Sequence, residues 1–268
     1  MEFEMGEGSR LERGTEITLY LNEDSYEFSN EYRAKEVIEK YCSFMPTPIF
    51  FENVDAPAKE APKKEESKDG EEAEEGKPQP LNDPNPLWTK HPNECTEEEY
   101  KDFYRKVFRD YKEPLFWIHL NMDYPFRMKG ILYFPKVNTE YDNLEGTIKL
   151  YCNQVFIADN IKEVIPEFLL LLKGTIDCPD LPLNVSRSAL QNDGFVKKIS
   201  EYITKKVADK LSGMYKVERE SYEKFWDDSA PFVKYGCLKD DKFRDKMKDF
   251  IIFKNLEGKY LIFVSRND

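Results

Sequence analysis

Residues 181–193 read LPLNVSRSALQND and lie between a short strand pattern and a long helical pattern. The apolar, proline-stiffened start of this stretch leads into a polar loop that carries a single cation, Arg187. The strand pattern before it is Thr175-Ile176-Asp177. The apolar residues after it recur at helical spacing and are Phe195, Ile199, Ile203, Val207 and Leu211. A strand, a polar loop and an amphipathic helix in this order favour an α/β architecture.

Arg187 is the residue of this loop with the most specific chemistry. Its guanidinium is planar and permanently charged, and it matches a phosphate or a carboxylate. If it reaches a bound nucleotide it can act as an arginine finger, a role worth roughly 10³–10⁵ in rate at an NTPase site. The alternative is a surface arginine that pairs with a nearby acid, which contributes little.

Composition excludes several classes of protein. The chain has 268 residues with a formal net charge of -12, which argues against a nucleic-acid binder with its usual basic face. No stretch is long and apolar enough to cross a bilayer, and the first residues lack the pattern of a signal peptide. The five cysteines and two histidines have no metal-ligand spacing, so we expect no metal site, reduced thiols and a cytoplasmic location.

The first third of the chain divides into a short structured piece and a charged segment. Alternating apolar residues predict a strand over residues 14–22, helical spacing predicts a helix over 29–42, and a second strand is expected within 44–51. Residues 53–80 are rich in Pro, Lys and Glu, and from residue 55 onward they have no aromatic side chain. This segment cannot bury enough apolar surface to order itself, so we expect a disordered linker.

The rest of the chain predicts one larger unit. Thr96 and Glu99 form a capping box at the start of a helix whose apolar face includes Tyr100 and ends near Tyr111. Strands are expected near residues 115–120, 126–134, 147–152, 155–157 and 175–177, with a helix from Pro166 to just before Gly174. After the long helix we expect helices near 218–226 and 239–250 and strands near 251–253 and 260–264.

Four stretches of this chain match one known family in its order. They are residues 14–21 (GTEITLYL) with 40–44 (KYCSF), 86–90 (PLWTK) with the helix that follows, 155–157 (VFI) through 165–167 (IPE), and 181–191 (LPLNVSRSALQ). Together they resemble the heat shock protein 90 chaperone family, and most of all its bacterial branch.

The resemblance implies a domain organisation. Residues 1–52 are similar to the end of the family's N-terminal ATPase domain, and 53–80 to its charged linker. Residues 81–212 resemble the large layered α/β/α unit of its middle domain, and 213–268 a helical extension that leads into a small α/β unit. The family's nucleotide-pocket motifs do not occur here, so we expect a piece of a longer protein that is inactive as an ATPase alone.

The same resemblance implies roles for five residues. The family's arginine at the position of Arg187 contacts the γ-phosphate of ATP, so Arg187 is the expected catalytic and ATP-contacting residue. Asn184 and Gln191 match polar residues that support this loop, although Asn184 could equally serve local turn chemistry. Thr15 matches a threonine near the adenine, and Trp88 an exposed tryptophan that contacts client proteins. A packing role for Trp88 is the alternative.

The function implied is that of an ATP-dependent chaperone of the stress response. ATP with Mg is expected in the intact protein, and no cofactor on this chain alone. The partners implied are unfolded or partly folded client proteins, the chain's own ATPase domain and a second copy in a homodimer, without nucleic acid or membrane. A non-catalytic client or co-chaperone binding module, with apolar patches around Trp88 and residues 115–134, is the alternative. A small-molecule hydrolase using Asp/Glu pairs has no residue spacing to support it.

Overall fold

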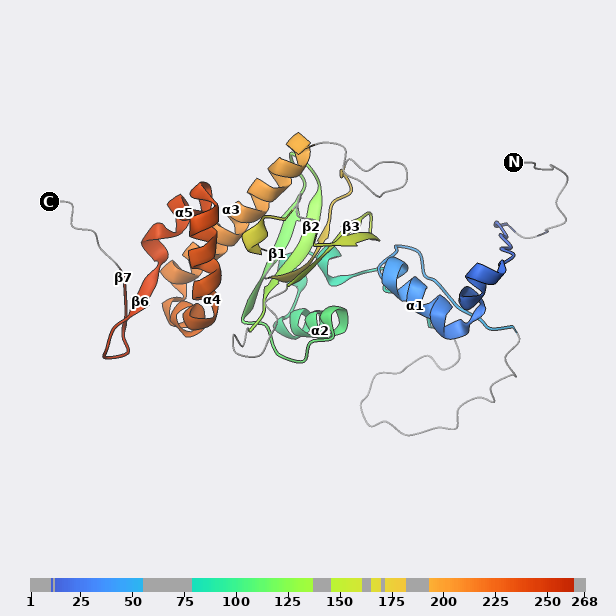
Figure 1. Ribbon diagram of the computed structural model, residues 1–268, viewed down its shortest axis with the longest axis horizontal. Helices are drawn as coiled ribbons and strands as arrows, with labels where there is room; N and C mark the ends of the chain where they lie inside the picture. The colour runs from blue at the N-terminus through green and yellow to red at the C-terminus, as the bar shows by residue number, and fades with distance from the viewer. Residues whose placement is uncertain are drawn as a thin grey trace, which may run out of the picture.

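A five-stranded sheet forms the centre of the protein (Figure 1). The structure is a computed structural model that describes residues 11, 13–54, 79–136, 146–160, 165–169, 172–181 and 193–262. The strands are β1 (Phe116–Met122), β2 (Met128–Phe134), β3 (Thr147–Cys152), β4 (Val155–Asp159) and β5 (Lys173–Asp177). Their order is β1-β2-β5-β3-β4, and all neighbours are antiparallel except the parallel pair β3–β5. Each of these strands was expected from the sequence.

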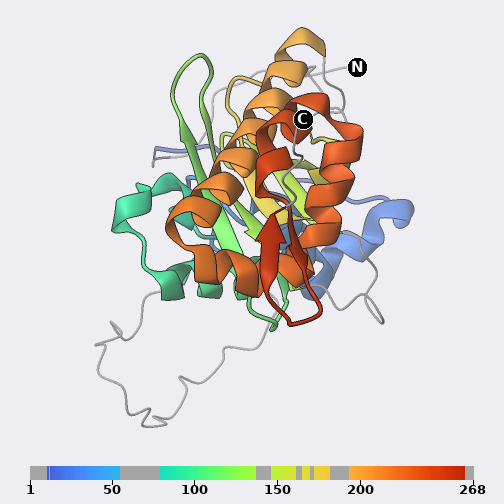
Figure 2. The same ribbon diagram turned by 90° about the vertical axis from the view of Figure 1, so that its left-hand side faces the viewer.

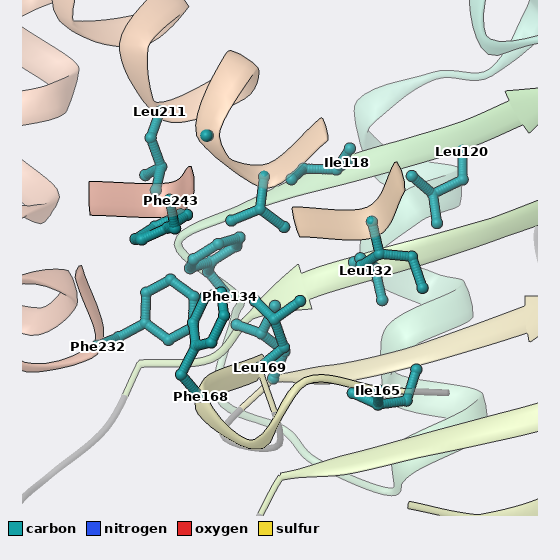
Figure 3. Packing of buried hydrophobic residues seen from close by; sticks show 14 of the residues in the cluster. Ile118, Leu120, Leu132, Phe134, Ile165, Phe168, Leu169, Leu211, Phe232 and Phe243 are labelled. Carbon is teal, nitrogen blue, oxygen red and sulfur yellow. The ribbon is translucent and has the colours of Figure 1, made fainter. Parts of the chain in front are cut away.

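Three helices share the larger core with one face of the sheet. They are α3 (Asp193–Val217), α4 (Arg219–Lys239) and α5 (Asp241–Met247), the last continuing into the short helix η5 (Lys248–Phe250). Figure 3 shows Leu132 and Phe134 of β2 and Phe232 of α4 among the side chains packed between these layers. Burial of these apolar side chains is the main contribution to the stability of the folded unit.

The opposite face carries a smaller, mainly aromatic core beneath α2 (Glu97–Phe108) and the short helix η2 (Leu87–Thr89), and the short helix η3 (Pro92–Glu94) lies between these two in the chain. The predicted capping box is present, since the Glu99 N–H donates to Thr96 Oγ1 at 3.3 Å and the Thr96 N–H donates to Glu99 Oε2 at 2.7 Å. The expected apolar face does not reach Tyr111. The helix ends at Phe108 because Arg109 adopts a left-handed conformation (φ 50°), and Tyr111 is exposed.

Helices on both faces of the sheet make an α/β/α layered unit, and α4 and α5 extend it, which confirms the expected fold class (Figures 1 and 2). The boundary expected at residue 212 lies inside α3, which continues to Val217. After α5 the chain forms a two-stranded hairpin of β6 (Ile252–Lys254) and β7 (Tyr260–Ile262). No helix in the described ranges is both long and apolar enough to span a membrane.

The N-terminal piece contains the predicted helix but not the predicted strands. Helix α1 (Glu31–Cys42) follows the short helix η1 (Glu23–Ser29), and its Tyr41 ring packs edge-on against Phe156 of β4 at 5.9 Å. Residues 13–22 and 43–54 form no strand, and the side chains of Ile17 and Leu19 are exposed. An extended segment becomes a strand only by pairing with a neighbour, and the described residues offer none here.

The helix expected to begin at Pro166 is also wrong in extent. The described residues contain only the short helix η4 (Glu167–Leu169), and Gly174 belongs to β5 instead of following a helix. Gly174 pairs with Leu132 of β2. The two strands pack so closely here that a side chain on residue 174 would collide with Leu132 and with the Ile131 carbonyl oxygen. Of the expected linker, residues 55–78 lie outside the described ranges.

Candidate functional site

We name residues 182–192, which the sequence singled out, the arginine loop. Arg187, Asn184 and Gln191 all lie in it, and all three are outside the described residues. The structure does describe both ends of the loop, which leaves the carboxyl end of β5 and returns at the start of α3. The site is therefore built from what holds these two ends.

The start of the arginine loop is fixed to the sheet and to the core. The Cys178 N–H donates to the Tyr151 carbonyl of β3 at 3.0 Å, which extends the β3–β5 pairing by one residue. The Leu181 N–H closes a turn onto the Cys178 carbonyl at 3.2 Å, and the Leu181 side chain is buried in the larger core. The last described residue before the loop is thus held on both its backbone and its side chain.

An ion pair adds a third attachment at this end. Arg127 lies between β1 and β2, and its Nη2 atom contacts Asp180 Oδ1 at 2.6 Å while its Nε contacts the same oxygen at 3.2 Å. The Arg127 backbone N–H also donates to Asp180 Oδ2 at 2.7 Å. These hydrogen bonds from Arg127 lower the pKa of Asp180 below its ordinary value. The carboxylate therefore stays ionised and paired at neutral pH.

The end of the arginine loop is fixed by the first turns of α3. Val196 and Ile199 are buried in the larger core. The Phe195 ring packs edge-on against Phe126 with a centroid distance of 5.2 Å, and Tyr202, two helical turns later, contacts Phe126 at 6.2 Å. Phe126 precedes Arg127 in the chain, so two consecutive residues contact the two ends of the loop.

A cavity of about 430 Å³ lies at the same edge of the sheet. Its lining includes Trp88, Arg127, Lys129, Gln154, Asp177 and Pro179. Asp177 is buried, and burial raises the pKa of its carboxyl group. It accepts a hydrogen bond of 3.0 Å from the backbone N–H of Gln154, which has a left-handed backbone (φ 63°). Asp177 therefore supports the tight turn between β3 and β4.

Trp88 does not present its ring at the surface. Its side chain is 0% exposed and packs against Phe44, Phe103 and Tyr151 at centroid distances of 4.7, 5.7 and 5.1 Å. Packing among aromatic rings is thus the role the structure gives it, and its burial corrects the expectation that this tryptophan is exposed. The strands between residues 115 and 134 likewise turn most of their apolar side chains into the two cores.

Thr15 is exposed and belongs to neither a helix nor a strand, so the strand expected around it does not form. Within the described ranges, no three His, Cys, Asp or Glu side chains gather as they would to hold a metal ion. The described residues at the two ends of the arginine loop hold these ends in place. They form no pair of a nucleophile and a base.

Sequence reasoning missed Phe126, Arg127 and Asp180. Asp180 directly precedes the quoted stretch, but its partner lies 53 residues earlier in the chain. No local spacing relates two positions so far apart, and only the antiparallel pairing of β1, β2 and β5 brings them together. A Tyr-Pro-Phe-Arg run at residues 124–127 carries no motif that would have indicated this role.

Comparison with known proteins gives a consistent result. The family model described as Hsp90 protein matches residues 74–263. "Chaperone protein htpG" of Bacteroides fragilis (strain YCH46) is 47% identical over 262 residues, which is 98% of this chain and 37% of that protein. The Porphyromonas gingivalis (strain ATCC 33277) "Chaperone protein HtpG" is 44% identical over 96% of this chain, and that of Desulfitobacterium hafniense (strain Y51) is 32% identical over 94%.

This chain spans 37% of the B. fragilis protein, 36% of the P. gingivalis protein and 38% of the D. hafniense protein. The matched region contains the whole described sheet, both ends of the arginine loop and the three helices that cover the larger core. The chain therefore belongs to the Hsp90 protein family.

Proposed function

We propose that this chain is the middle part of an ATP-dependent molecular chaperone, and that it supplies Arg187 to a nucleotide held by an ATPase domain. The relatives are named chaperones, and the match to them includes the arginine loop. The observation that carries the proposal is that both loop ends are packed into the same core. A loop anchored in this way can present a cation at a domain boundary at low entropic cost.

The physics of the contact explains how it would couple nucleotide to conformation. A guanidinium makes charge-assisted hydrogen bonds to phosphate oxygens, each contributing roughly 1.5–3 kcal/mol. The contact exists only when the two domains dock, so ATP binds the docked arrangement better than the open one. A ligand with such a difference in affinity shifts the population of the two states.

We assign few contacts with the nucleotide to the residues of this chain. Arg187 is the cation for the γ-phosphate, with Asn184 and Gln191 supporting its loop, and Thr15 would lie near the adenine. The chemistry that ATP with Mg supplies is a transferable phosphoryl group with its charge partly neutralised. The described residues hold no acidic cluster for Mg, so the proposal assigns that ion to the ATPase domain.

The proposal also assigns a domain to each part of the chain, and partners and a location to the intact protein. Residues 1–52 would be the end of the ATPase domain, 53–80 a charged linker, 81–212 the large unit of the middle domain, and 213–268 its extension. Clients would be unfolded or partly folded proteins in the cytoplasm, and the intact protein would act as a homodimer. We favour this over a non-catalytic binding module, because the patches expected around Trp88 and residues 115–134 are buried.

A chimera tests the proposal. This chain replaces the matching 262-residue segment of the B. fragilis protein, and ATP turnover is measured for the chimera and its Arg187→Ala variant. We expect turnover by the parent chimera and a loss of at least about 100-fold in kcat for the variant, since arginine fingers contribute roughly 10³–10⁵. Equal turnover by both, or a folded parent chimera that binds ATP without hydrolysing it, would contradict the proposal.

A further inference from the structure

We propose that Phe126 and Arg127 act together as a positioning brace that sets where the arginine loop points. This inference rests on the proposed function, because it assigns a role in presenting Arg187. The two residues are consecutive, and they contact opposite ends of the same loop. We name them the 126–127 brace.

At the start of the loop, the brace acts through Asp180. The carboxylate of Asp180 accepts three hydrogen bonds from Arg127 within 3.2 Å, two from the guanidinium and one from the backbone N–H. A guanidinium that meets a carboxylate with two of its nitrogens fixes direction as well as distance. Asp180 is separated from the arginine loop only by Leu181, which is itself buried. A shift of Asp180 is thus passed directly to the loop.

At the end of the loop, the brace acts through the first turns of α3. Phe126 is 4% exposed and its ring lies against both Phe195 and Tyr202. These two aromatic rings follow the loop by about one and three helical turns. The ring contacts therefore fix how α3 begins, and with it the point at which the chain leaves the loop.

Because Phe126 and Arg127 are adjacent, the backbone links the contacts that they make with the two ends of the arginine loop. Asp180 and the start of α3 each contact one of two adjacent residues, whose Cα atoms peptide geometry holds about 3.8 Å apart. A misplacement of about 1 Å in a catalytic group can cost roughly 100-fold in rate. The brace is a means of keeping such an error from the two ends that present the loop to a nucleotide.

The role is separable from simple stability. The Arg127 side chain is 63% exposed, so its replacement leaves no cavity. Exposed ion pairs contribute little to the free energy of unfolding. Replacement of Arg127 should therefore affect turnover much more than stability, whereas a purely structural residue would affect stability first.

The test uses the chimera described above with Arg127→Gln, Asp180→Ala and the double variant. We expect Arg127→Gln to lower kcat roughly tenfold with KM for ATP changed less than about twofold, and its unfolding temperature to stay close to that of the parent. Asp180→Ala removes the backbone contact as well and should cost at least as much. The double variant should equal Asp180→Ala, because Arg127 acts only through Asp180.

Arg244→Gln is the matched control, since Arg244 pairs with Asp241 at 2.9 Å on the surface of α5, which is not one of the two elements that flank the loop. Hydrogen exchange adds a second readout, and amides of residues 182–192 should exchange faster in Arg127→Gln but not in Arg244→Gln. A kcat for Arg127→Gln equal to that of Arg244→Gln, or losses that multiply in the double variant, would overturn the brace. If Arg187→Ala keeps full turnover, the proposed function fails instead, which is a different result.

Discussion

Asn82 and Ile49 are joined by a hydrogen bond of 2.7 Å, in which the Ile49 backbone N–H donates to Asn82 Oδ1. The Asn82 amide group donates in turn to the carbonyls of Met45 and Thr47 at 2.8 and 2.9 Å. The backbone adds a bond from the Leu81 N–H to the Ile49 carbonyl at 2.8 Å. The described residues before and after the charged segment therefore lie side by side, and one buried asparagine makes three of the hydrogen bonds between them.

The first prediction concerns Asn82 itself. Asn82→Ala should lower the free energy of unfolding by about 2–4 kcal/mol, because it leaves the Ile49 N–H and two carbonyls without their partner in a largely buried place. Chemical denaturation measures the change. Asn53→Ala at an exposed position near the same junction is the control, and equal midpoints for the two variants would contradict this reading of Asn82.

The second prediction concerns the length of the charged segment. The hydrogen bonds between residues 43–49 and 81–83 already hold its flanks together. Replacing residues 55–78 with a short glycine-serine linker should therefore leave the fold intact, and the shorter loop should stabilise it by at most about 1 kcal/mol. Thermal unfolding checks this. A fall in the unfolding temperature of more than a few degrees would show that the removed residues themselves stabilise the fold.

The third prediction uses two glycines as a matched pair. A Cβ atom on Gly130 of β2 would collide with the Thr175 carbonyl oxygen of β5 and lie 3.1 Å from the Ile176 Cα. Gly130→Ala should thus lower the free energy of unfolding by about 1–3 kcal/mol or more, since strand backbones cannot move aside cheaply. On α3, a Cβ atom on Gly213 meets nothing within 4 Å, and Gly213→Ala should stabilise by about 0.5–1 kcal/mol. Denaturant midpoints that shift in the same direction would refute the argument.

The fourth prediction concerns pH. Asp110 accepts hydrogen bonds from Lys173 Nζ at 2.6 Å and from Tyr104 Oη at 2.8 Å. Burial alone would raise the pKa of Asp110, but these bonds, together with the Lys112 backbone N–H, lower it below its ordinary value. Its stabilising contribution is therefore fully present above the ordinary aspartate pKa of about 3.9 and is lost as pH falls through the lowered one.

Asp110→Asn should accordingly cost about 1–2 kcal/mol at pH 7, where the half-buried pair is intact. The difference between wild type and variant should shrink as pH falls below about 4. Urea denaturation from pH 7 to pH 3 measures it. Asp241→Asn, at an exposed pair on α5, is the control, and a difference for Asp110→Asn that stays constant with pH would argue against the ionised carboxylate as the cause.

The amino-acid sequence by itself determined the local elements and the family. Hydrophobic periodicity predicted the five strands, α1 and α3, and the Thr96 and Glu99 pair predicted the start of α2, because these signals depend on neighbours within a few residues. The quoted motifs placed the chain in its family for the same reason, since they are contiguous. Local signals failed where a partner decides the outcome: residues 14–22 have a strand pattern but no neighbouring strand in the described part of the chain.

Tertiary structure alone decided which distant residues meet. The pairing of Arg127 with Asp180, the packing of Phe126 on α3, the burial of Trp88 and the Asn82 contacts all join positions separated by tens of residues. Their formation depends on the order of strands in the sheet and on which face each helix covers, and these follow from the combined burial of apolar area by the whole chain. No property of one segment specifies such a contact, because the contact depends on which other segments the fold brings beside it.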